Sequence, residues 1–479
     1  MLVIFVHGWS VQHTDTYGDL PSWLETQTGP QGLPLQVGDV YLGKYISFND
    51  AVTLDDIARA FDQAIRDTIA DKLRKGERFA CITHSTGGPV VRKWMDLYYR
   101  TRLDRCPLSH LVMLAPANHG SALAQLGKGR LSRMKFFFQG AEPGQRVLDW
   151  LEMGSEGSWD LNTSWLDYDC VAAGLYPFVL TGQSIDRKMY DALNSYTDEA
   201  GSDGVVRVAG ANMNYSLLRL SQDGSTLKVD KILRTVPTAI GVLPGLSHSG
   251  EEMGIIRSVT LDRGSSHPTS QWVLRCLRVG SSTAYRQVSN DLAVLTEKTQ
   301  KAEQTEKVKS FFGSRTYRNN RHSMVVFRVT DDRGNVLTDY DLFLTAGPNY
   351  DENALPPGFF VDRQRNQRNH GKLTYYLDYD VMNDGLAKPQ MEGRLGFRLV
   401  ARPQESEESL AFYRTLNFES NLAKLEKILR PNETVMIELQ LRRWVDTAVF
   451  QLSNERDPKN NRLLKKEPIE QKRRKKDVQ

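Results

Sequence analysis

Thr83-His84-Ser85-Thr86-Gly87 is the stretch of this sequence that decides the fold. It joins an apolar run of strand length, residues 78–82, to a segment with the composition of a helix, residues 88–95. A strand, a tight turn centred on serine and then a helix is the build that exposes a nucleophilic hydroxyl. The usual pattern has glycine on both sides, but Thr83 replaces the first one. We expect a relaxed turn or a displaced neighbouring strand where this β-branched side chain finds room.

The first strand-like run of the chain ends in a turn that contains glycine. Residues 2–6 are β-branched, aliphatic and aromatic, which is typical of a strand buried on both faces. They lead directly into His7-Gly8-Trp9. In enzymes with such a serine turn, one oxyanion donor follows this kind of strand and the other is the residue after the nucleophile. The sequence therefore predicts the backbone N–H groups of Trp9 and Thr86 as an oxyanion hole.

The order of these elements resembles the α/β-hydrolase fold, and in particular its lipase branch. The resemblance covers about residues 1–280, and it is carried by His7-Gly8, the turn at Ser85, residues 114–121 and residues 201–206. It implies a mostly parallel sheet with flanking helices and a lid or cap insertion. The chain departs from the pattern at Thr83 and begins at the oxyanion strand, without the two usual leading strands.

The resemblance implies that an acid and then a histidine follow the serine along the chain. A serine hydroxyl is a poor nucleophile unless a histidine accepts its proton. His248 follows a strand-like run, residues 238–243, and opens a segment that could begin a helix. His248 is therefore the preferred base. His267, in a loop rich in glycine, serine and proline, is the alternative.

Two carboxylates compete for the role of the acid that orients the histidine. Asp203 lies in a Ser-Asp-Gly turn before two valines and matches the lipase pattern. Asp186 follows the strand-like run 176–182 more directly. Asp203 is the preferred acid, and Asp186 stays open as the alternative.

Composition is that of an ordinary globular protein, with 40% hydrophobic and 25% charged residues. A net charge of +4 is too small to argue for a nucleic-acid partner. We find no signal peptide and no apolar run long enough to cross a bilayer, so we expect a cytoplasmic location in the producing cell. The cysteines lack metal-ligand spacing and no glycine-rich phosphate loop is present, so we predict no cofactor and no metal.

A chain of 479 residues is too long for one core and predicts two domains. Residues 1–280 form the predicted catalytic domain, with a cap at about 123–170 whose three consecutive phenylalanines suit acyl chains or a membrane surface. Residues 281–316 read as a connector helix. Residues 317–452 alternate strand-like runs with turns, which predicts a β-rich, antiparallel, sandwich-like domain. Residues 453–479 form a basic tail, predicted to be disordered.

These features predict a serine carboxylic-ester hydrolase acting on lipid esters, a lipase or phospholipase with a Ser-His-Asp triad. Two alternatives stay open: a small-molecule esterase or thioesterase, and a non-catalytic hydrolase-like scaffold whose β-domain binds a partner. The architecture also resembles bacterial phospholipase toxins delivered by type VI secretion. That resemblance implies an immunity protein or the secretion machinery as partners.

Overall fold

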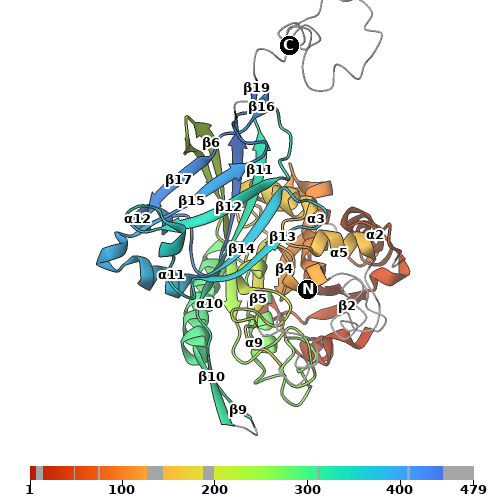
Figure 1. The fold of residues 1–479 in the computed structure, drawn as a ribbon. Coiled ribbons are helices and arrows are strands. Elements are labelled where there is room, and N and C mark those ends of the chain that lie inside the picture. Colours follow the sequence, from red (N-terminus) through yellow and green to blue (C-terminus); the bar gives the residue numbers. More distant parts are fainter. Residues whose placement is uncertain are drawn as a thin grey trace, which may run out of the picture.

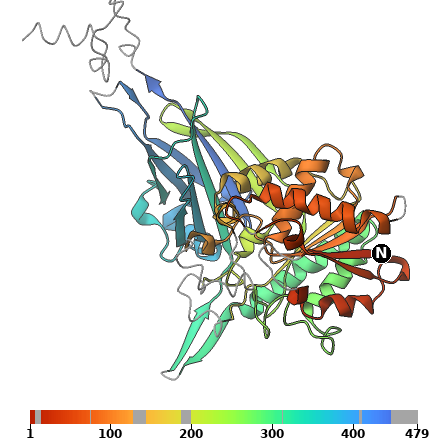
Figure 2. The same ribbon diagram turned by 90° about the vertical axis from the view of Figure 1, so that its right-hand side faces the viewer.

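The computed structural model describes residues 1–6, 14–47, 49–73, 76–126, 144–186, 199–310, 313–406 and 410–445 (Figure 1). Two sheets, of six and nine strands, organise these residues. They lie side by side in Figures 1 and 2. No helix in these ranges is both long enough and apolar enough to cross a membrane.

The first sheet is parallel throughout, in the order β2-β1-β3-β4-β5-β8. Its strands are β1 (Leu2–Val6), β2 (Gln36–Val40), β3 (Phe79–His84), β4 (Leu108–Leu114), β5 (Tyr176–Thr181) and β8 (Ala239–Val242). The central strands are mostly apolar, as expected where helices cover both faces of a parallel sheet. The order reverses between β1 and β3, and ligands of open α/β sheets bind at the carboxyl ends of the strands beside such a reversal.

Helices α2 (Leu54–Thr68) and α3 (Gly87–Tyr99) cover one face of this sheet. Their side chains, such as Phe61 and Trp94, share a core with Cys81 of β3. The opposite face is covered by α1 (Leu20–Glu25), α9 (Pro268–Leu277) and α10 (Ser282–Glu303). The predicted α/β-hydrolase fold, with its parallel sheet and flanking helices, is confirmed for this part of the chain.

The second sheet has the order β12-β15-β17-β7-β6-β18-β11-β14-β13. Its strands are β6 (Tyr215–Asp223), β7 (Thr226–Arg234), β11 (His322–Asp331), β12 (Tyr340–Ala346), β13 (Phe360–Arg365), β14 (Lys372–Asp378), β15 (Arg394–Ala401), β17 (Leu416–Asn421) and β18 (Thr434–Leu441). The sheet curls around a core of its own, to which α11 (Tyr379–Leu386) and α12 (Leu422–Leu425) contribute (Figure 2).

This second sheet corrects two details of the sequence prediction. The predicted β-rich domain is confirmed, but its nine strands form one curled sheet that is not antiparallel throughout, because β18 pairs in parallel with both β11 and β6. The hairpin β6–β7 also comes from within residues 1–280, so the division between the sheets does not follow the predicted boundary at 280. The pairing of β6 with β18 joins residues more than 200 positions apart, and no local pattern encodes it.

The predicted connector also contains more than a helix. After α10 the chain forms the hairpin β9 (Thr305–Ser310) and β10 (Gly313–Arg318), which extends away from both sheets in Figure 1. A further short pair, β16 (Ala411–Phe412) and β19 (Trp444–Val445), lies near the end of the described chain.

Part of the predicted cap lies between the two sheets. The described part includes α5 (Gln145–Leu151) and α6 (Glu156–Ser164). Met153 and Trp159 share a core with Tyr376 of β14. Beside them, the fully buried ammonium of Lys372 lies 2.8 Å from the carboxylate of Glu156. The phenylalanine run and the rest of 127–143 lie outside the described residues, as does the basic tail.

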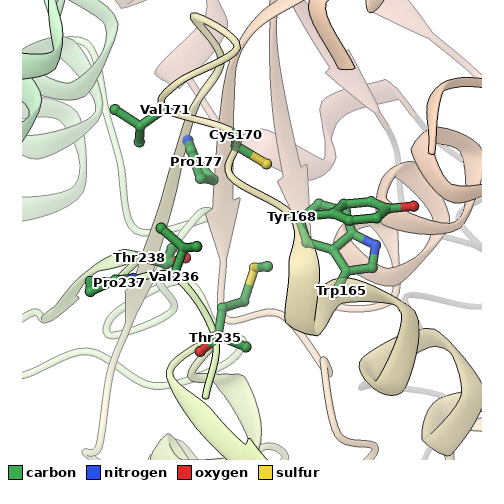
Figure 3. A pocket seen from close by; sticks show the side chains of 10 residues that line it. Trp165, Tyr168, Cys170, Val171, Pro177, Thr235, Val236, Pro237 and Thr238 are labelled. Atoms are coloured by element: carbon green, nitrogen blue, oxygen red, sulfur yellow. The ribbon is translucent and has the colours of Figure 1, made fainter. Parts of the chain in front are cut away.

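A small cavity lies beside the segment that leads from β7 back to β8. Figure 3 shows a cavity between the short helix η8 (Trp165–Asp167) and the segment that links the two strands. It is lined by Trp165, Tyr168, Cys170, Val171, Pro177, Met213, Thr235, Val236, Pro237 and Thr238.

Candidate active site

Ser85 occupies a strained turn between β3, which ends at His84, and α3, which begins at Gly87. Its φ of 53° lies in the left-handed region that residues with a Cβ rarely adopt. The turn is held from the next strand, because the Ser85 N–H donates to the Leu114 carbonyl at 3.0 Å. This strain is the conformation expected of a serine presented at a sharp strand-to-helix turn.

Thr83 is fully buried in β3 and pairs regularly with both neighbouring strands. It lies opposite Val6 on β1 and Met113 on β4, with no register shift at either position. The room comes from Gly87, where a Cβ would lie 3.2 Å from the Cβ of Thr83. The expectation of a relaxed turn or displaced strand is therefore wrong: the second glycine of the motif accommodates Thr83.

The predicted serine, base and acid meet although they are far apart in sequence. Nε2 of His248 lies 3.1 Å from Oγ of Ser85, and Nδ1 of the same ring lies 2.9 Å from Oδ2 of Asp203. The histidine is 1% exposed and the aspartate is not exposed at all. Ser85 is partly exposed. One end of this hydrogen-bonded chain is thus shielded and the other is open to a ligand.

The turn around Asp203 fixes its carboxylate. Oδ1 accepts the backbone N–H groups of Val205 at 3.0 Å and Val206 at 2.7 Å. Oδ2 is thereby left to face His248. The backbone N–H of His248 also donates to the carbonyl of Asp203 at 2.9 Å, so the two loops are joined through main chain as well as side chain.

The alternatives lie elsewhere. His267 caps the amino end of α9 by accepting the Thr269 N–H, and its Nε2 lies 2.9 Å from the Ser258 hydroxyl. Asp186 follows β5 and is partly exposed, whereas Nδ1 of His248 bonds to Asp203. The structure thus brings His248, and not His267, to Ser85, and it brings Asp203, and not Asp186, to His248.

His84 lies directly behind the base. Its Nε2 lies 3.2 Å from the carbonyl of His248, and the two ring centroids are 4.7 Å apart. Burial, together with the nearby His248, holds the pKa of His84 well below its usual value. A neutral ring at this position supports the loop of His248 without adding a charge beside it.

A buried polar network under the site was not predicted from the sequence. The guanidinium of Arg92, fully buried in α3, donates to Asn118 Oδ1 at 3.1 Å and to Asn162 Oδ1 at 2.9 Å. Asn162 also lies 3.3 Å from Nδ1 of His119, and burial and the charge of Arg92 lower the pKa of His119 to about 3. An arginine on the apolar face of a predicted helix is the one sequence signal that could have revealed it.

Of the two predicted oxyanion donors, only Thr86 lies within the described residues. Thr86 is the buried N-cap residue of α3, at the positive end of the helix dipole. Trp9 lies outside the described residues. Within the described ranges, no group of three or more histidine, cysteine or acidic side chains could hold a metal ion.

A scan against protein-family models and a search of curated proteins both find no match. Among solved structures, the phospholipase PlaB from Legionella pneumophila is 60% identical, with a TM-score of 0.90 over 98% of each chain. The same enzyme in complex with thio-NAD is 59% identical, with a TM-score of 0.89 over 98% of this chain and 99% of that chain. This chain belongs to the PlaB phospholipase family.

Membership of the PlaB family confirms the predicted lipase and phospholipase branch, and with it the enzyme class. The chain is a carboxylic-ester hydrolase. The likeness spans both sheets, so the β-rich part belongs to the family architecture as much as the parallel sheet does.

Proposed function

We propose that Ser85, His248 and Asp203 form a catalytic triad that hydrolyses phospholipid carboxylic esters through an acyl-enzyme. The observation that carries this proposal is the continuous chain of hydrogen bonds, 3.1 Å from Ser85 to His248 and 2.9 Å from His248 to Asp203. The strained backbone at Ser85 and the identity to PlaB support it.

In the acylation step, Oγ of Ser85 attacks the ester carbonyl while Nε2 of His248 takes its proton. Asp203 holds the imidazole with Nδ1–H directed at Oδ2 and stabilises the imidazolium that forms. The N–H groups of Thr86 and Trp9 donate hydrogen bonds to the negatively charged carbonyl oxygen. Losing one such donor typically lowers kcat by about 10²- to 10³-fold. The imidazolium then gives its proton to the leaving alcohol oxygen, and the lysophospholipid departs.

Deacylation repeats the same steps with water. His248 removes a proton from the water as its oxygen attacks the acyl carbonyl, and then returns a proton to Ser85 as the bond to the acyl group breaks. The second product is a fatty acid.

The deciding experiment is labelling of the full chain with a fluorophosphonate probe, with Ser85→Ala as the control, followed by a substrate panel. The proposal predicts labelling and phospholipid hydrolysis that both vanish in Ser85→Ala. An esterase or thioesterase would prefer a water-soluble short-chain substrate to micellar phospholipid. A non-catalytic scaffold would fail to label at all.

A second proposal concerns nicotinamide dinucleotides, because the 59% identical PlaB was solved in complex with thio-NAD. In dinucleotide-binding folds a G-x-G-x-x-G turn after the first strand binds the pyrophosphate. Here residues 7–12, which follow β1, read His-Gly-Trp-Ser-Val-Gln, so that pattern is missing and the ligand would bind elsewhere. A rise in Tm with added NAD, retained in Ser85→Ala, would support this proposal, and no shift at millimolar NAD would refute it.

Delivery into a competing bacterium is a separate proposal, which rests on architecture alone. It includes a cytoplasmic location before export, contact with a membrane surface, and an immunity or secretion partner. Directing the chain to the periplasm of a test bacterium should then damage the membrane, and Ser85→Ala should abolish the damage. Active enzyme without toxicity would overturn it.

A further inference from the structure

The loop that carries Asp203 is held by the β-rich sheet. Tyr376, on β14, is fully buried, and its hydroxyl lies 3.0 Å from the Ala200 carbonyl and 3.1 Å from the Gly201 carbonyl. These two carbonyls precede Asp203 by three and two residues. A side chain more than 170 positions away in sequence thus fixes the backbone just before the acid.

A second anchor acts just after Asp203. The guanidinium of Arg207 is 2% exposed, binds both carboxylate oxygens of Glu199, and lies 2.5 Å from Oδ2 of Asp362 on β13. It also lies 4.1 Å above the ring of Tyr376. Such paired and bidentate contacts set a geometry more rigidly than a single hydrogen bond. The loop is therefore attached to β13 and β14 on both sides of Asp203.

The contact leaves little room for the loop to shift. Gly201 has a φ of 74°, and a Cβ there would lie 2.5 Å from the hydroxyl of Tyr376 and 2.6 Å from Nδ1 of His322. Since the N–H of His248 donates to the carbonyl of Asp203, a shift of this loop would also move the base.

We infer that Tyr376 is a positioning residue for ester hydrolysis, acting from the β-rich sheet through the Asp203 loop. The inference rests on the proposed role of Asp203. The hydroxyl of Tyr376 keeps the loop where Oδ2 of Asp203 meets Nδ1 of His248, without touching substrate or reacting atoms. The β-rich sheet thus supports the acid of the proposed triad from outside the site.

The test is Tyr376→Phe in the full chain, which removes the hydroxyl and keeps the ring over Arg207. The matched control is Tyr375→Phe. Tyr375 is also buried, and its hydroxyl donates to the Leu342 carbonyl at 2.6 Å inside the core of the curled sheet. Both variants lose one buried hydroxyl that donates to backbone carbonyls, but only the hydroxyl of Tyr376 faces the acid loop.

We expect Tyr376→Phe to lower kcat about tenfold, since small displacements of a catalytic group cost rate steeply. KM should stay within about twofold, because the substrate contacts are intact. Fluorophosphonate labelling of Ser85 should slow in parallel. Tyr375→Phe should keep the kcat of the parent at a temperature where thermal unfolding shows both variants folded.

Equal kcat in Tyr376→Phe and the parent would overturn the inference, and so would an equal loss in both variants. If Tyr376→Phe does not fold, Asp362→Asn takes its place and should lower kcat in the same way through Arg207. An active Ser85→Ala variant would instead refute the proposed triad. A wrong role for Tyr376 and a wrong triad would therefore give different results.

Discussion

His248 and Ser85 are separated by 163 positions in the chain, yet Nε2 of one lies 3.1 Å from Oγ of the other. Both residues lie at the carboxyl end of the parallel sheet, although β4 and β5 separate their strands: Ser85 follows β3, and His248 follows β8 through a short loop. The intervening chain leaves the parallel sheet, builds the hairpin β6–β7, and returns before it presents the histidine.

The first prediction concerns Asp203→Asn. The amide would present N–H groups to Nδ1 of His248 and favour the wrong tautomer, with the fold retained. We expect kcat to fall by about 10⁴, the magnitude typical of this change in serine hydrolases. The measurement is phospholipid turnover with circular dichroism as a check on folding. Asp186→Asn is the control and should keep full activity. Full activity in Asp203→Asn, with loss of activity in Asp186→Asn, would instead identify Asp186 as the acid.

The second prediction concerns Thr83→Val. The Thr83 hydroxyl is buried and has no hydrogen-bond partner among the described residues. Since an unsatisfied buried polar group is costly, the apolar isostere should raise the free energy of unfolding by about 1 kcal/mol. Urea unfolding would measure it. Thr181→Val, where the buried hydroxyl contacts the Gly182 carbonyl, should show no gain. Equal shifts in the two variants would contradict this account of Thr83.

The third prediction concerns Arg92→Ala. Truncation would leave the amide oxygens of Asn118 and Asn162 buried without their donor and would open space beside Trp165. We expect a loss of about 3 kcal/mol in the free energy of unfolding. Arg59→Ala, at an exposed position of α2, should change stability by less than about 0.5 kcal/mol. Similar urea midpoints for both variants would mean that the buried network contributes nothing.

The sequence carried enough information to predict which serine, histidine and aspartate lie within hydrogen-bond distance of one another, because each lies in a local pattern. Ser85 stands between a strand and a helix, Asp203 in a Ser-Asp-Gly turn, and His248 just after a strand. Turn chemistry and apolar runs are local properties, and they favoured Asp203 and His248, which the structure places in one hydrogen-bonded chain with Ser85. Thr83 shows the limit of that approach, because the room that it needs is supplied by Gly87 across the turn.

The β-rich sheet could not be predicted in the same way. Nothing in residues 215–223 says that they pair with β18, since strand order depends on contacts between distant residues. The role inferred for Tyr376 has no local signature either, because Tyr375 and Tyr376 are the same residue type in one strand. Only the alternation of side chains between the two faces of the sheet decides which tyrosine meets the acid loop.

The fourth prediction concerns stability against pH. His110 is buried in β4, with Nε2 2.7 Å from the Val279 carbonyl, and burial lowers its pKa to about 4. Between pH 6.5 and pH 4 the unfolded chain therefore binds a proton at this histidine that the folded chain does not, so stability rises with pH across this window. At pH 5 the loss is about 2 kcal/mol for one such histidine. His119, with a pKa of about 3, acts in the same direction.

His110→Gln should make the fall in Tm from pH 6.5 to 5 shallower, whereas His370→Gln, at an exposed side chain, should leave it unchanged. An identical slope in His110→Gln and the parent would mean that His110 does not contribute to acid sensitivity.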